Sequence, residues 1–298
     1  MIRCEELTKY FNGTQALNGC SFEILEPTLT GVIGVNGAGK TTLFKSLAGF
    51  LKPTRGEAYV LEEPAFQNIV AAQNVMLIEE GMAFYTTASL YELMESYRRF
   101  YQNFDQSLAI KMTEYFHLSD KKKYSDLSKG MKSTFRLILA LSARAPLTLL
   151  DEPTTGMDPG VRKELYELIL KDYIKVPRII LISSHYLGEM EELLDSILFI
   201  HEGKVLKHDN VEEFQTFLKG VQGPPELIES LEKNIKIYDR KDFGEGIRRI
   251  IVESKDLESL SLEEDEMNNL TVKGISPEDA FVYLTQRKGG GIDELYHS

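Results

Sequence analysis

A glycine-rich run with one lysine and one threonine has the residue types and spacing of a phosphate-binding loop. Residues 34–41 read Gly-Val-Asn-Gly-Ala-Gly-Lys-Thr and match the pattern GxxxxGK[ST]. Glycines let successive backbone N–H groups converge on phosphate oxygens, and a helix N-terminus adds the positive end of its dipole. We therefore expect Lys40 to reach the β- and γ-phosphates of a nucleoside triphosphate, and the Thr41 hydroxyl to hold Mg²⁺.

The segments on both sides of this loop are those that a phosphate site needs. An apolar run over 29–35 predicts a buried strand before the loop, and Leu43, Phe44 and Leu47 recur at helical spacing after it. The alternative is a turn that only joins a strand to a helix, since tight turns use glycine in any protein. The strand and the helix together favour the phosphate site, so we expect the chain to bind a nucleoside triphosphate.

Two adjacent acids follow a second apolar run. Residues 147–150 predict a buried strand that ends in Asp151 and Glu152. Carboxylates at the carboxyl edge of an α/β sheet lie where such proteins bind their ligands. We expect Asp151 to support Mg²⁺ through its water shell, and Glu152 to take a proton from an attacking water. Solvated acids at a strand end are the alternative, and the apolar run before them argues against it.

A histidine follows a third strand of the same kind. Residues 178–182 predict a buried strand that leads to Ser183, Ser184 and His185. A lone histidine after a strand is more often structural than catalytic, but this one shares a sheet edge with the acids. We therefore expect His185 to contact the γ-phosphate.

Two further turns have helix-capping residues. Ser128 is placed to cap a helix over 133–144, so that its hydroxyl and the N–H groups behind it form a second anion site. Taken alone, this would be an ordinary helix start. Asp158 followed by Pro159 predicts the N-cap and first position of another helix.

Length, charge and cysteine usage limit the class of protein. The 298 residues exceed what one core usually holds, and 43% hydrophobic with 27% charged residues is ordinary for a globular chain. The formal net charge of −12 argues against a broad face for nucleic acid. Cys4 and Cys20 lack metal-site or disulfide spacing and suit a reducing cytosol. The negative charge also implies weak repulsion from anionic membranes, so we expect any membrane association to go through a protein partner. No run approaches the length of a membrane span.

Aromatic residues gather in two places. Tyr10 and Phe11 precede an Asn-Gly loop, where either packing at a strand edge or stacking on a nucleotide base would suit them. Ser89 and Glu92 form a capping box that opens a helical region reaching about residue 145. The aromatic side chains between 84 and 104 are equally compatible with a partner groove and with the core of that region.

These motifs, in this order over about residues 3–215, resemble the ATP-binding subunit of an ABC transporter. GVNGAGKT at 34–41 is similar to the family's Walker A motif, and LTLLDE at 147–152 to its Walker B motif with the general base. LSKGM at 127–131 is similar to the signature motif, and TGMD at 155–158 to the D-loop. The specificity of the resemblance comes from the ordered set.

The same resemblance implies a fold and a set of site residues. The fold is α/β, a RecA-like P-loop NTPase core with an antiparallel β portion and a helical subdomain at about 80–145. His185 is similar to the switch histidine, and Phe11, with Tyr10 beside it, to the aromatic that stacks on adenine. The resemblance implies catalytic roles for Glu152 and His185, metal contacts from Thr41, Asp151 and Glu80, and ATP contacts from Phe11, Asn36, Gly37, Ala38, Gly39, Lys40, Thr41, Thr42, Ser128, Gly130 and Asp158.

Two motifs depart from the family's pattern. Glu80 stands where the family has the glutamine of its Q-loop, just after a strand predicted over 75–78. A carboxylate can still coordinate Mg²⁺ through oxygen, but its charge would alter metal affinity and the timing of coupling. Lys129 replaces the usual first glycine of the signature, and Met131 its common glutamine. The SKGM form resembles a bacterial subgroup serving exporters of drugs, lipids or antimicrobial peptides, and Lys129 would add a positive charge near phosphate.

The resemblance also implies partners. In the family, the signature of one subunit faces the phosphate loop of another, so two subunits would close around two ATP molecules. With one set of motifs, this chain would need a second ATP-binding subunit, identical or paralogous, and integral membrane permease subunits at the cytoplasmic face of the cell membrane. A soluble ABC-type ATPase acting on ribosomes or DNA is one alternative, although such proteins typically carry two ATPase halves or a long coiled-coil insertion. A P-loop kinase is another, and LSKGM and His185 disfavour it.

The resemblance thins after an ATPase domain over 1–215, and we expect an accessory region over 216–298. A helix over 226–234, strands over 249–253 and 270–273, and a helix that starts near Ser276 indicate a small α+β appendage. It is similar in position to the accessory C-terminal regions of exporter ATPases. Regulation, dimerisation and a passive extension are open as its role.

Overall fold

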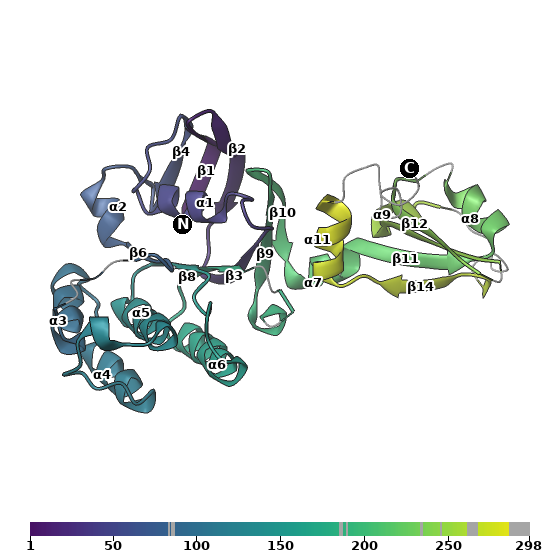
Figure 1. Cartoon of the computed structure of the whole chain (residues 1–298). Coiled ribbons are helices and arrows are strands. Elements are labelled where there is room, and N and C mark those ends of the chain that lie inside the picture. Colours follow the sequence, from purple (N-terminus) through teal and green to yellow (C-terminus); the bar gives the residue numbers. More distant parts are fainter. Residues whose placement is uncertain are drawn as a thin grey trace. The chain divides into compact units, whose positions relative to one another are not determined.

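The computed structural model describes residues 1–82, 84, 87–184, 187–188, 190–232, 235–244, 246–260 and 268–285. The chain divides into two compact units, Met1–His208 and Asp209–Ser298. Figure 1 labels most of the elements of both units.

A mostly parallel sheet forms the centre of the first unit. Its strand order is β10-β9-β3-β8-β7-β6, and the strands from β9 to β6 run parallel (Figure 1). Continuous apolar runs form these strands because a parallel sheet is buried on both faces. The strands predicted at 75–78, 147–150 and 178–182 are confirmed. The bounds are β3 (Thr28–Ile33), β6 (Val75–Ile78), β7 (Leu147–Asp151), β8 (Ile179–Ser184), β9 (Ser196–His201) and β10 (Lys204–Asn210).

An antiparallel sheet shares one core with the parallel sheet. Its order is β2-β1-β4-β5, and Asn12 and Gly13, with φ of 44° and 87°, make the tight turn that joins β1 to β2. Leu43, Phe44 and Leu47 of α1 are fully buried in the shared core. The predicted antiparallel portion is thus confirmed. The bounds are β1 (Ile2–Phe11), β2 (Thr14–Ile24), β4 (Arg55–Val60), β5 (Glu63–Pro64) and α1 (Lys40–Leu47).

The segment between β6 and β7 is helical, as predicted. The capping box is confirmed, since Ser89 Oγ accepts from the Glu92 N–H at 3.2 Å and the Glu92 carboxylate accepts from the Ser89 N–H at 2.8 Å. The predicted start of the next long helix at 133 is wrong, because the Ser128 cap starts it at Lys129. The helices are α3 (Leu90–Phe100), α4 (Gln106–Tyr115) and α5 (Lys129–Ala143), and a short α2 (Ile69–Gln73) precedes β6.

The aromatic residues of this helical region divide between its core and its surface. Tyr101 and Phe104 are buried, and Tyr101 stacks with Tyr97 at 5.8 Å between ring centroids. Tyr91 and Phe100 are exposed. Core packing therefore accounts for part of the aromatic content.

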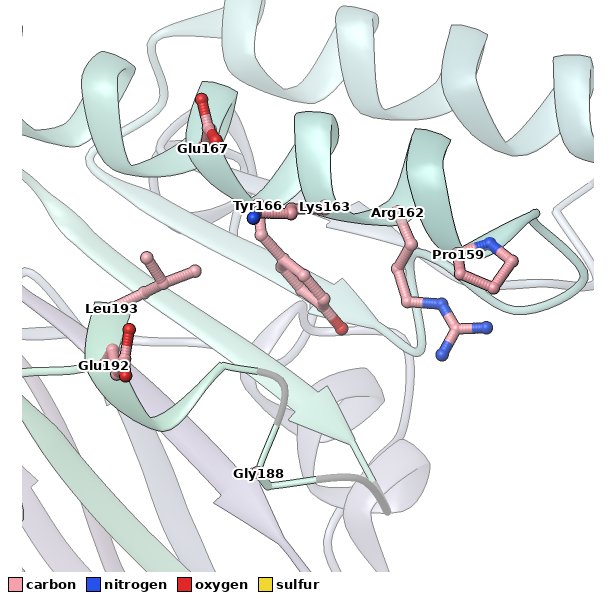
Figure 2. A pocket seen from close by; sticks show the side chains of 8 residues that line it. All are labelled: Pro159, Arg162, Lys163, Tyr166, Glu167, Gly188, Glu192 and Leu193. Carbon is pink, nitrogen blue, oxygen red and sulfur yellow. The ribbon is translucent and has the colours of Figure 1, made fainter.

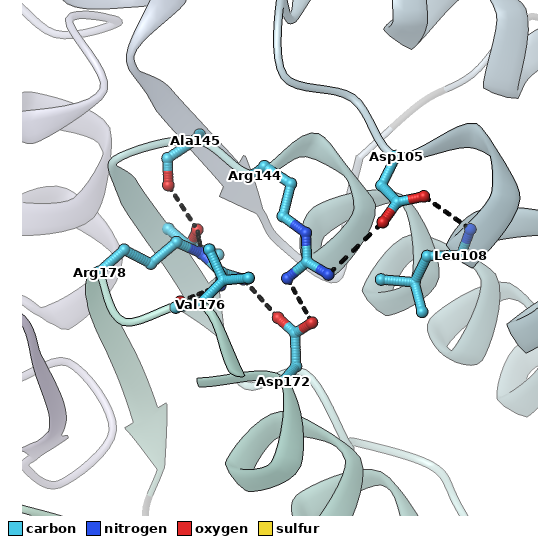
Figure 3. A network of polar contacts seen from close by, with 8 residues as sticks. Asp105, Leu108, Arg144, Ala145, Asp172, Val176 and Arg178 are labelled. Carbon is cyan, nitrogen blue, oxygen red and sulfur yellow. Dashed lines mark hydrogen bonds and ion pairs between the residues drawn. The ribbon is translucent and has the colours of Figure 1, made fainter. Parts of the chain in front are cut away.

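A buried ion network joins the helical region to the parallel sheet. Asp172, on α6 (Pro159–Lys175), accepts from Arg178 Nη2 at 2.8 Å through one oxygen and contacts Arg144 through the other. Arg144 also lies 3.7 Å from Asp105, which caps α4 (Figure 3). Burial lowers the pKa of Arg178, and the neighbouring Asp172 carboxylate opposes that shift. The two guanidiniums therefore share the Asp172 carboxylate, and Asp105 is a second, more distant carboxylate for Arg144.

The second unit has its own sheet and core. The sheet order is β12-β13-β11-β14, and all three pairings are antiparallel (Figure 1). Val221, Ile250 and Val252 pack with Ile228 and Leu231 of a helix. The predicted α+β appendage is confirmed. The bounds are β11 (Leu218–Gly223), β12 (Ile237–Phe243), β13 (Ile247–Glu253), β14 (Thr271–Gly274), α7 (Val211–Phe217), α8 (Pro225–Glu232), α9 (Ser254–Glu258) and α11 (Pro277–Thr285).

Candidate nucleotide-binding site

The loop between β3 and α1 has a conformation that depends on its glycines. Gly37 and Gly39 have φ of 81° and 110°, which side chains rarely adopt. A Cβ on Gly39 would lie 2.6 Å from the Ala16 carbonyl oxygen, and one on Gly34 would lie 2.5 Å from that of Ile200. A Cβ on Gly37 would meet nothing within 4 Å. The loop backbone therefore packs closely against neighbouring backbone at Gly34 and Gly39. The space beside Gly37 is open, and a phosphate can approach the N–H groups of the loop there.

Lys40 starts α1 and turns back into the loop. Its Nζ donates to the Gly34 carbonyl oxygen at 2.6 Å and lies 3.8 Å from a carboxylate oxygen of Glu152. Only 6% of the side chain is exposed. Burial lowers the pKa of Lys40, while Glu152 and Asp151 oppose that shift. The ammonium thus lies inside the loop, paired with groups that phosphate oxygens could replace.

A hydroxyl and a carboxylate meet beside this lysine. Thr41 Oγ1 donates to Asp151 Oδ2 at 2.6 Å, and Ser183 Oγ donates to the other carboxylate oxygen at 2.5 Å. Asp151 is buried at the end of β7, one strand from Ser183 on β8. Hydroxyl and carboxylate oxygens suit Mg²⁺. Within the described ranges no three His, Cys, Asp or Glu side chains could hold a metal together.

Glu152 leaves β7 through an unusual backbone conformation. Its φ is 48°, in the left-handed region, and its N–H donates to Ser183 Oγ at 2.9 Å. Thr155 Oγ1 donates to its carboxylate at 3.3 Å. A non-glycine residue held there costs on the order of 1–3 kcal/mol, and such strain gathers at functional sites. This backbone conformation places the Glu152 carboxylate beside the Lys40 ammonium of the 34–41 loop.

Ser128, Gly130 and Asp158 line another cavity of about 440 Å³. Ser128 Oγ accepts from the Met131 N–H at 3.3 Å, as expected of an N-cap. Asp158 occupies the predicted N-cap of α6 and Pro159 the first helical position, but the Asp158 side chain makes no capping hydrogen bond. No described residue that lines this cavity belongs to the 34–41 loop. Ser128, Gly130 and Asp158 therefore share this cavity with one another and not with the 34–41 loop.

Glu80 was expected at the metal and has a different partner in this structure. Its Oε1 lies 2.6 Å from Lys129 Nζ at the start of α5. Arg136 of α5 donates to the carbonyl oxygens of Glu79 and Glu80, at 2.8 Å for Glu79. The structure thus joins the two unusual positions of the sequence to each other. A metal contact from Glu80 stays a prediction.

The remaining predicted residues differ in their surroundings. Phe11 is 42% exposed at the end of β1, beside the exposed Tyr10, and Lys9 Nζ lies 5.0 Å above its ring. An exposed ring suits stacking on a base. Asn36 is exposed in the loop. Ala38 is buried just before α1, and Thr42 is half-buried in the first turn of α1. His185 lies outside the described residues.

The structure adds to the site two side chains for which no role was predicted. Ser183 bonds both Asp151 and the Glu152 N–H, and Thr155 bonds the Glu152 carboxylate. Ser183 follows a recognisable buried strand, which marks it as lying at the sheet edge. Its contact with Asp151 depends on the β7–β8 register, which a single sequence does not reveal.

A further cavity of about 460 Å³ is lined by Arg162 and Tyr166 of α6 and by Gly188, Glu192 and Leu193. Figure 2 shows Arg162 and Tyr166 pointing away from α6 on the side where Gly188, Glu192 and Leu193 lie. Tyr166 is held by its hydroxyl, 3.1 Å from Thr154 Oγ1. None of the predicted ATP contacts lines this cavity.

Known proteins are similar to this chain in sequence and in fold. Residues 17–155 match the family model described as ABC transporter. The bacitracin transport ATP-binding protein BcrA of Enterococcus faecalis is 31% identical over 216 residues, which is 72% of this chain and 70% of that protein. The lantibiotic transport ATP-binding protein SrtF of Streptococcus pyogenes is 31% identical over 208 residues, which is 69% of this chain and 89% of that protein. A solved ATP-binding subunit of an ABC transporter has a TM-score of 0.65 at 24% identity, and covers 72% of this chain and 92% of its own.

This chain therefore belongs to the family of ABC transporter ATP-binding proteins. It is the ATP-binding subunit of such a transporter and hydrolyses ATP to drive transport. The RecA-like P-loop NTPase core that the sequence predicted is confirmed. Across the part of the chain that the structure describes, the helices are too short or too polar to span a bilayer.

Proposed function

We propose that this subunit forms two ATP sites together with a second ATP-binding subunit, and that it drives export of an antimicrobial peptide through separate permease subunits. The observation that carries the proposal is the separation of the two groups of predicted contacts. Lys40 and Thr41 lie at the 34–41 loop, whereas Ser128, Gly130 and Asp158 line a cavity that this loop does not reach. A second subunit can bring one group to the other.

In this proposal the loop binds the triphosphate of its own chain. Lys40 exchanges the Gly34 carbonyl oxygen for β- and γ-phosphate oxygens, which satisfy a buried ammonium better because they carry charge. The N–H groups from Asn36 to Thr42 surround the phosphates, and Phe11 stacks on adenine. Thr41 and Asp151 are the residues that would hold Mg²⁺, which, when bound, neutralises phosphate charge.

Glu152 is the proposed general base. Its carboxylate lies 3.8 Å from Lys40 Nζ, so it is already beside the place where the γ-phosphate would lie. From there it can accept the proton of an attacking water. His185 is proposed to contact the γ-phosphate, as expected from the sequence. Ser128, Gly130 and Asp158 of the second subunit complete the site.

The cargo and the partners are proposed from the relatives. BcrA of Enterococcus faecalis is named for bacitracin transport and SrtF of Streptococcus pyogenes for lantibiotic transport. The SKGM form of the signature agrees with an exporter of antimicrobial peptides. We propose that the chain works at the cytoplasmic face of the cell membrane, bound to integral permease subunits. A soluble ATPase acting on ribosomes or DNA is not favoured.

The Glu152→Gln variant tests this function. Loss of the base should leave ATP binding intact and stop hydrolysis, so the variant should accumulate as an ATP-bound dimer, measured by light scattering coupled to gel filtration. The exposed Glu23→Gln substitution is the matched control and should stay monomeric at the same ATP concentration. A Glu152→Gln chain that binds ATP but remains monomeric at saturating ATP and Mg²⁺ would contradict the proposal.

A further inference from the structure

The two residues at which this chain departs most from the family pattern contact each other. Lys129 Nζ lies 2.6 Å from Glu80 Oε1. Lys129 is the first residue of α5, directly after the Ser128 turn, and Glu80 follows β6. Lys129 lines the same cavity as Ser128 and Gly130. A positive charge thus stands at the surface that the proposed function turns toward the triphosphate of a second subunit.

The stem of Lys129 is held apart from its charged end. A Cβ added to Gly156 would lie 3.1 Å from Lys129 Cε and 3.2 Å from its Cδ, so the aliphatic chain packs against this glycine. Gly156 has φ of 78°, which other residues rarely adopt. The signature turn and the loop before α6 therefore fix the direction of the side chain, and the ammonium can change partner without moving the stem.

The ion pair itself is poorly suited to bracing the fold. The Lys129 side chain is 62% exposed and that of Glu80 is 50% exposed, and water screens such pairs so that they add little stability. The loop at Glu80 has other attachments. Arg136 donates to the carbonyl oxygens of Glu79 and Glu80, and Lys45 of α1 pairs with the Glu79 carboxylate at 2.7 Å. The pair can open while the loop stays in place.

We propose that Lys129 is a binding residue for the triphosphate that a second subunit presents, and that Glu80 is the positioning residue that holds its ammonium until then. This inference rests on the proposed function. On closure the ammonium exchanges one carboxylate for phosphate oxygens, which carry more negative charge and form strong charge-assisted hydrogen bonds. The Glu80 carboxylate is then released from the ion pair. The ion pair therefore delays closure of the dimer until ATP is bound. Without ATP the second subunit has no phosphate oxygens that could replace the Glu80 carboxylate as the partner of Lys129.

The test measures the ATP concentration that gives half-maximal dimerisation of the full chain carrying Glu152→Gln. Lys129→Met keeps the stem on Gly156 and removes the charge, so it should raise that concentration by about tenfold or more. Glu80→Gln removes the competing carboxylate and should lower it. Lys129→Arg should stay close to the parent. Lys121→Met, at another exposed lysine of the same unit, is the matched control and should change nothing.

Exchanging the two charges distinguishes a lysine that changes its partner on closure from an ion pair that only stabilises the fold. A chain with both Glu80→Lys and Lys129→Glu can form the pair in the opposite sense, so a brace would give the behaviour of the parent. Exchange predicts the reverse, since a carboxylate at position 129 would repel the phosphates, and dimerisation should be weaker than with Lys129→Met alone. Binding of a fluorescent ATP analogue to each monomer is measured without Mg²⁺, so that the predicted metal contact of Glu80 plays no part, and is expected to be unchanged, which shows that the fold and the 34–41 loop are intact. Should Lys129→Met fail that check, Lys129→Gln replaces it.

The results distinguish this inference from the function on which it rests. A parent chain that never dimerises with ATP would overturn the proposed function. A parent that dimerises normally, combined with an unchanged Lys129→Met or a charge reversal that behaves as the parent, would overturn only the role of Lys129. An unchanged Glu80→Gln would overturn the role of Glu80.

Discussion

Thr41 and Asp151 are joined by a hydrogen bond of 2.6 Å between the first turn of α1 and the end of β7. The bond links the phosphate loop to the strand that carries the proposed base. Asp151 has a second partner in Ser183 of β8, whose hydroxyl donates to the other carboxylate oxygen. Three elements far apart in sequence thus bring together a hydroxyl and a carboxylate that are proposed to hold Mg²⁺.

Replacing Asp151 should separate metal-dependent activity from folding. In Asp151→Asn the side chain keeps its size but loses its charge, so we expect ATPase activity to fall by roughly 100-fold or more. Raising the Mg²⁺ concentration should recover part of it. Phosphate release measured across a Mg²⁺ series checks this, with Asp120→Asn as the control. Normal activity at low Mg²⁺ would exclude Asp151 from the metal site.

Binding of ATP should be linked to proton uptake at high pH through Lys40. Burial lowers the pKa of Lys40, so its ammonium loses the proton at lower pH than an ordinary lysine. Phosphate favours the charged form and raises the pKa again. Between those two pKa values, ATP binding must therefore take up a proton, and affinity must fall as pH rises.

Calorimetry in buffers of different ionisation enthalpy, over a pH series that rises to the ordinary lysine pKa of about 10.4, measures that proton. Lys40→Arg is the control, because the guanidinium stays charged throughout this series and should show no uptake. Equal heats for the wild-type chain in all buffers would contradict the linkage.

The buried ion network predicts a large and specific loss of stability. In Asp172→Ala, Arg144 and Arg178 lose the carboxylate that pairs with both, and an uncompensated buried charge costs about 3–5 kcal/mol. Urea unfolding should show this decrease in the free energy of unfolding. Glu167→Gln, which removes an exposed ion pair from the same helix, should change it by less than about 1 kcal/mol. Similar effects of the two substitutions would show that the network is not the cause.

Local patterns predicted much of the fold and the phosphate loop. The apolar runs that became β6, β7 and β8 and the Ser89 capping box were readable because each depends on neighbouring residues. The same holds for the 34–41 loop, whose glycines are required by its own backbone.

The remaining features depend on distant parts of the chain. The Ser183–Asp151 contact needs the strand register, and the Glu80–Lys129 pair needs β6 and α5 to lie together. The start of α5 was missed because Gly130 weakens the helical pattern after the Ser128 cap. The sequence also did not show which aromatic rings of the helical region are buried, because this depends on how its helices pack together.

The most direct test of the central claim is to mix two inactive chains. Lys40→Met disables the phosphate loop and keeps the Ser128 turn, whereas Ser128→Arg does the opposite. If each ATP site takes its two halves from different subunits, both variants should be inactive alone, and their mixture should recover ATPase activity through dimers with one intact site. A mixture as inactive as its components, or a Ser128→Arg chain with full activity, would contradict the account.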